Sequence, residues 1–169
     1  MSTSKSIVSS AHLAGSGPTG LSEFEYGLIV ASGAFSRWVV RCMAAAGWPD
    51  LGYLDVLALH SVNHRDREKR AADIGFVLGI EDVHTVTYAL KKLVRHGLVE
   101  RHRRGKEAHF AITEQGRKAC TAYGEVRQAC LLDALEVLGL EGDALEDVAG
   151  RLRALSGLYD QGARAAASL

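Results

Sequence analysis

Residues 84–106 carry side chains of the two kinds that a DNA-binding surface needs. Hydrogen-bonding groups near the start of a helix can reach base edges, whereas cations farther along can contact phosphates. The candidates for the first role are His84, Thr85, Thr87 and Tyr88. The candidates for the second role are Lys91, Lys92, Arg95, Arg103, Arg104 and Lys106. The types and order of these residues therefore predict an interface with double-stranded DNA.

The charge of the chain is unevenly distributed, although its 20 basic and 20 acidic residues balance. Residues 91–106 contain seven Lys or Arg against the single acid Glu100, whereas residues 133–147 contain six acids and no Lys or Arg. A solvated helix face accounts for Lys91 and Lys92, but it accounts less well for a basic cluster that continues beyond the helix. A clustered basic surface in a neutral protein is typical of nucleic-acid binding.

Two helices joined by a tight turn must position these side chains. The apolar set of the first, short helix is Ala72, Ile74, Val77 and Leu78. Gly79 suits the left-handed cap that ends this helix, and Asp82 can cap the next one. The inward-facing set of the second helix is Val83, Val86, Leu90, Leu93 and Val94. At this spacing the polar residues between His84 and Arg95 face outward.

A basic β-hairpin is predicted after the second helix. Gly97 ends the helix, and Leu98 and Val99 begin a strand. Gly105 supplies the positive φ of a tight turn. The apolar residues that alternate on the return strand are Ala108, Phe110 and Ile112. The mixed-charge run 65–70, which precedes the two helices, is interpreted as a solvated helix end and loop. The alternative is that Arg65, Arg67 or Arg70 contacts a phosphate.

Helices on both sides of this region carry more apolar surface than one chain can bury. Residues 22–25 fit a capping box that opens the first helix at Ser22, and Thr113 caps a later helix. The stripe of the first helix is Phe24, Leu28, Ala31, Phe35, Trp38 and Cys42. The stripe of the later helix is Ala119, Tyr123, Val126, Cys130 and Val137. A last helix from about Asp143 has the heptad-like set Leu145, Val148, Leu152, Leu155 and Tyr159. This excess predicts a symmetric homodimer.

Residues 71–116 resemble the winged-helix core of the MarR family of bacterial transcription regulators. The stretches that carry the resemblance are Ala72–Gly79, Thr85–Arg101 and Thr113–Gly116. The chain departs from the family pattern at two places. Tyr88 stands where family members commonly have an arginine, and the wing at 103–107 lacks an Asp-x-Arg element. The resemblance therefore does not imply which operator sequence is read.

The resemblance implies a mainly α fold with a small β-wing, in which a winged helix-turn-helix is flanked by dimerisation helices. The corresponding division is a flexible tail at 1–20, an N-terminal dimerisation helix at 21–50, a DNA-binding domain at 51–113 and C-terminal dimerisation helices at 114–169. It also implies a homodimeric transcription regulator of the repressor type, which binds a pseudo-palindromic operator through its recognition helix and basic wing. A small-molecule effector is expected between the dimerisation helices and the winged helix, where Trp38, Trp48 and Tyr53 are candidate lining residues. No cofactor is implied.

Metal binding and redox sensing are weaker interpretations. His60 and His64 have an i,i+4 spacing that zinc accepts, but no further ligand is evident nearby. A solvent-facing pair near a helix end is the simpler interpretation. Cys42, Cys120 and Cys130 lie on predicted apolar stripes, where thiols are usually packing residues.

Catalysis and membrane insertion are not expected. The chain has no G-x-S-x-G, no phosphate loop and no H-E-x-x-H, and no apolar run approaches the roughly 18 residues of a membrane span. An odd number of widely spaced cysteines indicates reduced thiols and a cytoplasmic protein. The alternative from another functional class is a dimeric winged-helix module that binds protein instead of DNA.

Overall fold

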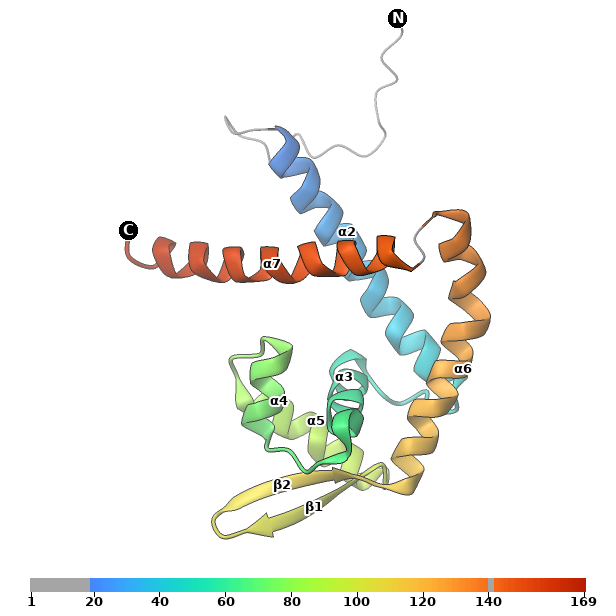
Figure 1. The fold of residues 1–169 in the computed structure, drawn as a ribbon. Helices are drawn as coiled ribbons and strands as arrows, with labels where there is room; N and C mark the ends of the chain where they lie inside the picture. The colour runs from blue at the N-terminus through green and yellow to red at the C-terminus, as the bar shows by residue number, and fades with distance from the viewer. Residues whose placement is uncertain (1–18, 140–141) are drawn as a thin grey trace, which may run out of the picture. The chain divides into compact units, whose positions relative to one another are not determined.

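The computed structural model describes residues 19–139 and 142–169, which form two compact units (Figure 1). The first unit extends to Gly124, and the second begins at Glu125. The elements in chain order are α2 (Thr19–Ala45), α3 (Tyr53–Asn63), the 3-10 turn η1 (His64–Asp66), α4 (Ala71–Leu78), α5 (Val83–Arg95), β1 (Val99–Arg104), β2 (Glu107–Ile112), α6 (Glu114–Val137) and α7 (Asp143–Ala166). This mainly helical fold with a two-stranded sheet confirms the predicted fold class. The predicted flexible tail at 1–20 falls almost entirely outside the described residues.

Apolar side chains of α3, α4 and α5 form the core of the first unit. Its fully buried members include Val56, Leu59, Val62, Ile74, Val86, Leu90 and Leu93. Figure 1 shows the three helices gathered on one side of the hairpin. The predicted inward set of α5 is wrong at Val83, which is 39% exposed because it lies in the first turn, beyond the core. Ala89, which the periodicity omitted, is buried instead.

The turn between α4 and α5 has the predicted chemistry. Gly79 caps α4 with φ 66°, in the left-handed region that glycine adopts without steric penalty. Asp82 precedes α5, and its carboxylate accepts the backbone N–H of His84 at 2.9 Å. The predicted apolar face of α4 is only partly correct. Ile74 is buried, but Val77 is 73% exposed because this two-turn helix contacts the core along one narrow side.

The hairpin has the predicted antiparallel register and turn. Val99 pairs with Ile112 at its base and Arg104 with Glu107 at its tip, where Gly105 has φ 61°. Phe110 and Ile112 are buried, as their alternation predicted. Lys69 forms an additional antiparallel bridge with Phe110, with two backbone hydrogen bonds of 2.9 Å. The 65–70 run is therefore not only a solvated loop, because one part of it lies along the edge of β2.

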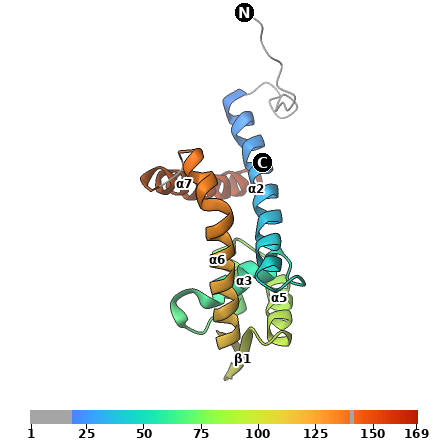
Figure 2. The ribbon, with the colours of Figure 1, turned by 90° about the vertical axis from the view of Figure 1, so that its right-hand side faces the viewer.

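α2 begins earlier than the sequence predicted, and only part of its apolar surface is buried. Ser22 is buried inside the helix and does not cap it, because the helix already begins at Thr19. The buried apolar positions are Val39, Cys42 and Met43, near its C-terminal end, whereas Phe35 is exposed. This end of α2 lies against α3 (Figure 2). The rest of the helix leaves an apolar face uncovered within the chain.

α2 also passes a test of length and composition for a membrane span, contrary to the sequence-based expectation. An 18-residue stretch within Gly20–Ala45 has a mean hydropathy of 1.3. The expectation relied on an unbroken apolar run, whereas a mean value is still high when a few polar residues interrupt the run. Core helices and signal sequences meet the same criterion, so the finding is weak evidence for insertion. Only 17% of this stretch is buried, which fits a helix with an uncovered face.

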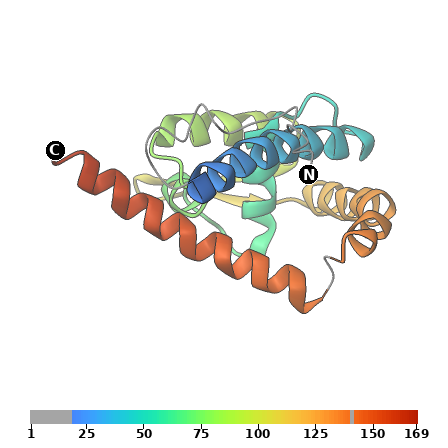
Figure 3. The same cartoon turned by 90° about the horizontal axis from the view of Figure 1, so that it is seen from above.

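The second unit contains the C-terminal part of α6 and α7. Ala119 and Tyr123 of the predicted α6 stripe are buried, but Cys130 and Val137 are exposed because the first unit's core ends near Gly124. Figure 3 shows α7 as one unbroken helix. The predicted Asp147–Arg151 ion pair is present at 2.7 Å, and no residue of α7 is buried. Four members of its heptad-like apolar set are exposed, namely Leu145, Val148, Leu152 and Tyr159, whereas Leu155 is half-buried.

Candidate nucleic-acid interface

The packing of α5 determines which of its side chains face solvent. Val86, Ala89, Leu90 and Leu93 are buried against the core, so the opposite side of the helix is presented outward. The carboxylate of Asp82 accepts the His84 N–H and, at 3.1 Å, the Thr85 hydroxyl. The first of these hydrogen bonds is the main reason that the pKa of Asp82 is lowered. The first turn of α5 is therefore held by an ionised cap.

Most of the side chains predicted on the outer face of α5 are exposed. His84, Thr85, Lys91 and Arg95 are open to solvent, and Tyr88 is 66% exposed. Thr87 differs from this group, although it was predicted to face outward. It is half-buried, and its hydroxyl donates to the Val83 carbonyl at 2.9 Å.

Lys92 does not face outward, which corrects the prediction that it is available for phosphate. Its Nζ lies 2.7 Å from the Asp55 carboxylate and 2.5 Å from the Asp50 carbonyl oxygen. Asp55 is buried and also accepts the N–H of Gly52 at 2.8 Å. Successive residues of a helix are rotated by about 100°, so Lys92 points toward α3 whereas Lys91 points to solvent. Lys92 therefore joins α5 to the start of α3.

The wing consists of β1, β2 and their turn. Because side chains alternate along a strand, the cations of β1 lie on two opposite faces of the hairpin. Arg101 and Arg103 lie on one side of β1, where their partners are Phe110 and Ala108. His102 and Arg104 lie on the other side. Arg101 was not among the predicted phosphate contacts, although its two-residue spacing from Arg103 was the available signal.

A groove of about 470 Å³ lies between α4, α5 and the wing. Lys91 and Thr87 line it from α5, Arg101 from β1, and Arg70 and Glu107 from its other sides. A neighbouring groove of about 330 Å³ is lined by Lys91, Val94, Arg95, Arg101 and Phe110. Helix and wing cations thus meet at one surface, which is suited to contact with a polyanion.

The cations around this surface differ in their partners. Within the described residues, no carboxylate pairs with Lys91, Arg95, Arg101, Arg103 or Lys106. Arg103 donates from Nε to the carbonyl oxygen of Gly105 at 3.1 Å. Arg104 lies 2.8 Å from Glu68, so its charge is already compensated.

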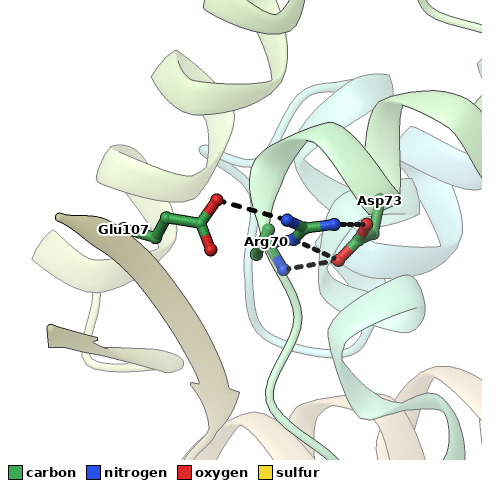
Figure 4. Close-up of polar contacts among 3 residues, drawn as sticks. All are labelled: Arg70, Asp73 and Glu107. Atoms are coloured by element: carbon green, nitrogen blue, oxygen red, sulfur yellow. Dashed lines mark hydrogen bonds and ion pairs between the residues drawn. The ribbon is translucent and has the colours of Figure 1, made fainter. Parts of the chain in front are cut away.

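Arg70 is also occupied by carboxylates, as Figure 4 shows. Its guanidinium donates to both oxygens of Asp73 at 2.8 and 3.0 Å and to Glu107 at 3.2 Å. The Arg70 hydrogen bond is the largest cause of the lowered pKa of Asp73. Arg70 thus connects the start of α4 with the tip of the wing.

The histidine pair predicted from the sequence is not a solvent-facing pair. His60 packs edge-on against Tyr123 with ring centroids 4.7 Å apart. His64 caps the end of α3, and the chain leaves the helix at Arg65, which has φ 62°. Among the residues that the structure describes, no three His, Cys, Asp or Glu side chains are grouped as metal ligands.

The assignment of the cysteines to packed stripes is confirmed for Cys42 and Cys120, which are buried, and is wrong for Cys130. Cys42 is buried, and its thiol donates to the Tyr123 carbonyl at 3.4 Å. Burial raises the pKa of Cys120 to about 11, so this thiol is a poor nucleophile at neutral pH. Cys130 is exposed on α6.

The aromatic residues predicted to line an effector site make separate ring contacts. Trp48 lies edge-on to His96 at 6.1 Å, and Tyr53 lies edge-on to Phe35 at 6.3 Å. Neither of the two grooves beside the wing includes Trp38, Trp48 or Tyr53 in its lining.

Residues 51–116 match the family model of the winged helix DNA-binding domain. The fold is similar to a MarR family transcriptional regulator from Rhodococcus sp. RHA1, with TM-score 0.67, 16% identity and coverage of 79% of this chain and 91% of that one. It is also similar to the MarR family regulator NMB1585 from Neisseria meningitidis, with TM-score 0.65, 19% identity and coverage of 86% and 96%.

A third similar structure is CouR from Rhodococcus jostii RHA1 bound to p-coumaroyl-CoA, with TM-score 0.66, 17% identity and coverage of 78% and 90%. No curated protein sequence matches the chain. The resemblance stated from the sequence is confirmed, because the chain has the winged-helix fold of MarR-family regulators.

Proposed function

We propose that this protein is a DNA-binding transcription regulator, of the repressor type found among MarR-family proteins. The observation that carries the proposal is the surface shared by α5 and the wing, where five cations have no carboxylate partner among the described residues. A winged helix-turn-helix with such a surface is suited to place α5 in the major groove and the wing along the adjacent backbone.

Within this proposal, the two ends of α5 have different tasks. His84, Thr85 and Tyr88 are near its exposed start and are assigned to base edges. Lys91 and Arg95, together with the unpaired wing cations, are assigned to phosphates. Thr87 is assigned a lesser role because its hydroxyl proton is used within the helix. Lys92 is left out of the contact set because it is bound to Asp55.

We further propose that the active species is a homodimer. The uncovered apolar faces of α2, α6 and α7 support this, because monomeric proteins rarely leave such surfaces open. A two-fold dimer would place two copies of α5 about one DNA turn, roughly 34 Å, apart and would select a pseudo-palindromic operator. Light scattering at micromolar concentration tests this step, and a monodisperse monomer would contradict it.

A small-molecule effector is part of the proposal because a protein of similar fold was obtained with p-coumaroyl-CoA. We place the protein in the cytoplasm, where it has access to DNA, and we assign it no catalytic activity, because proteins with this fold include transcription regulators.

A mobility-shift titration tests DNA binding. The probes are the DNA upstream of the protein's own gene and a random duplex of equal length. We expect both to bind at low salt and the upstream DNA to bind more tightly, with affinities that fall steeply as salt rises. Loss of Lys91 and Arg95 together should weaken binding to both probes.

The alternative function is a dimeric winged-helix module that binds protein. Two exposed apolar side chains on α4, Phe76 at 88% and Val77 at 73%, favour it, as does Tyr88 in place of a cation on α5. The same titration separates the two functions. Absence of binding to both probes at low salt contradicts the DNA-binding proposal and favours the protein-binding one.

A further inference from the structure

The segment between η1 and α4 places an acidic residue against the basic wing. Lys69 exchanges two backbone hydrogen bonds with Phe110, so the segment lies along β2. The Lys69 ammonium also binds the carbonyl oxygens of Val62, His64 and Arg67. Glu68, the preceding residue, is therefore held in a fixed position, and its side chain is only 22% exposed.

The carboxylate of Glu68 serves two wing cations with its two oxygens. Oε1 lies 2.6 Å from Nδ1 of His102, and Oε2 lies 2.8 Å from Nε of Arg104. Oε2 is buried and accepts no hydrogen bond of good geometry, so its contact with Arg104 is an ion pair only. The Arg104 side chain is 69% exposed, so solvent and ligands have access to it.

A DNA phosphate would compete with Glu68 for the same arginine. A guanidinium binds a carboxylate and a phosphate with the same N–H groups. Arg104 therefore needs to leave Glu68 before it can bind a phosphate fully. We propose that Glu68 is an internal competitor of DNA, which holds Arg104 in the free protein and is exchanged for a backbone phosphate when DNA binds.

His102 makes this exchange easier, because it remains beside Glu68 after Arg104 leaves. The hydrogen bond with Glu68 is the main cause of the raised pKa of His102. Its Nε2 also lies 3.5 Å from Glu100 on its own strand. The other charged or titratable neighbours are Arg104 on the same side of β1 and His109, the residue opposite on β2.

The consequence is a pH dependence of DNA affinity. Below the raised pKa of His102, the imidazolium compensates Glu68 and Arg104 is free to exchange. Above it, Arg104 is the remaining cation on Glu68, and the wing has one positive charge fewer. DNA affinity is therefore expected to fall as pH rises through the pKa of His102.

This inference rests on the proposed DNA binding, and its test starts from the wild-type protein with a random-sequence duplex. Fluorescence anisotropy is measured for the full-length wild type, Glu68→Gln and Glu146→Gln, at several salt concentrations. Glu146→Gln is the matched control, because it removes one negative charge from α7 and leaves the wing unchanged. We expect Glu68→Gln to bind about two- to five-fold more tightly at low salt, which is the range of an exposed ion pair. Glu146→Gln should stay within about twofold of the wild type, since none of the described ion pairs joins Glu146 to the wing.

The outcomes separate this inference from the function on which it rests. Tighter binding by Glu68→Gln, in excess of the control, supports the exchange. Unchanged or weaker binding by Glu68→Gln, with wild type still binding, overturns the exchange and leaves the proposed function intact. No binding by the wild type overturns both.

His102→Gln provides a second readout that does not require Glu68 to be changed. Between pH 6 and 8.5 we expect wild-type affinity to fall more than that of His102→Gln, and the two to converge at the alkaline end. Equal pH dependence in both proteins would contradict the exchange even if Glu68→Gln were poorly folded.

Discussion

The two halves of the basic surface, α5 and the wing, carry their positive charge under different conditions. On α5, Lys91 and Arg95 are exposed and have no carboxylate partner among the described residues, whereas Lys92 is turned into the protein and bound to Asp55. On the wing, Arg104 and His102 share Glu68. On the helix, some cations point to solvent and one points into the protein. On the wing, a carboxylate at the surface compensates part of the positive charge.

This difference shows that a count of basic residues overstates the charge that is available to DNA. Residues 91–106 contain seven Lys or Arg, but two of them, Lys92 and Arg104, are paired with Asp55 and Glu68. Asp55 and Glu68 both lie outside the counted stretch, in α3 and before α4. Carboxylates that the fold brings from other parts of the sequence therefore decide how much of a local positive charge is available to a ligand.

Gly116 offers the most severe way to disturb the wing without touching α5. A Cβ at this position would lie 2.1 Å from the Leu98 carbonyl oxygen and 2.6 Å from Cδ1 of Ile112, at the base of the hairpin. We expect Gly116→Ala to lower the free energy of unfolding by about 3 kcal/mol or more, because backbone must move to admit the methyl group. Urea unfolding measures the loss.

Gly124→Ala is the control for Gly116→Ala. Gly124 also lies in α6, but a Cβ there meets nothing within 4 Å. This change should raise stability slightly, by up to about 1 kcal/mol, through helix propensity. Equal effects of the two substitutions would show that the base of the wing tolerates displacement.

Lys91→Met and Lys92→Met compare the two directions within α5. Lys92→Met leaves Asp55 buried without its cation, and we expect a loss of about 2 kcal/mol in stability with little change in the salt dependence of DNA binding. Lys91→Met should leave stability within about 0.5 kcal/mol and reduce the slope of log affinity against log salt by about 0.9. Thermal unfolding and salt titrations check both. The opposite assignment of effects would restore Lys92 as a phosphate ligand.

Arg103→Gln and Arg104→Gln compare a wing cation without a carboxylate partner to one that has Glu68. We expect Arg103→Gln to weaken binding to random DNA about five-fold at low salt, and Arg104→Gln only about twofold, because the phosphate contact of Arg104 is offset by the loss of its ion pair with Glu68. Anisotropy titrations at one ionic strength are sufficient. A larger effect from Arg104→Gln would indicate that Glu68 does not compete.

The smallest expected effect concerns the free protein, in which pH alters the contact between Glu68 and the wing. Glu68 has a lowered pKa, so its contribution is complete above its ordinary value of 4.5 and is lost as pH falls through the lowered pKa. His102 has a raised pKa, so its contribution is complete below its ordinary value of 6.5 and is lost as pH rises through the raised pKa.

The contact is therefore strongest between pH 4.5 and 6.5. NMR titration of the His102 ring measures this directly, with Glu68→Gln as the comparison. An equal midpoint for His102 in both proteins would remove Glu68 as the cause. The protection factor of the Lys69 amide, which is its hydrogen-exchange rate relative to the intrinsic rate at the same pH, should be largest in the same window.

Local signals in the sequence predicted much of the first unit correctly. Gly79 and Gly105 mark turns because their φ is positive, and Asp82 and Thr113 cap helices because their side chains accept nearby backbone N–H groups. Such features depend on neighbours within a few residues, so a single sequence contains the necessary information.

The incorrect or missing assignments all depend on residues that are distant in sequence. Lys92 has the same type and nearly the same position as Lys91, and only Asp55 distinguishes them. Cys130 continues the α6 stripe but lies beyond the point at which the core ends. Glu68 was part of a mixed-charge run whose contact with the wing required the β-bridge at Lys69. The periodicity of a sequence does not indicate these partners, because they are brought together by tertiary packing.

The β-bridge at Lys69 has a consequence for changes in chain length. The main chain of Lys69 is paired with Phe110 while its ammonium closes the end of α3, so the number of residues between α3 and α4 is fixed from both sides. Successive side chains in an extended segment point in opposite directions, and a shift by one residue would move Glu68 away from His102 and Arg104. A single-residue deletion in this connection should therefore be less tolerated than a conservative substitution at the same place, although the segment lies outside the helices and named strands.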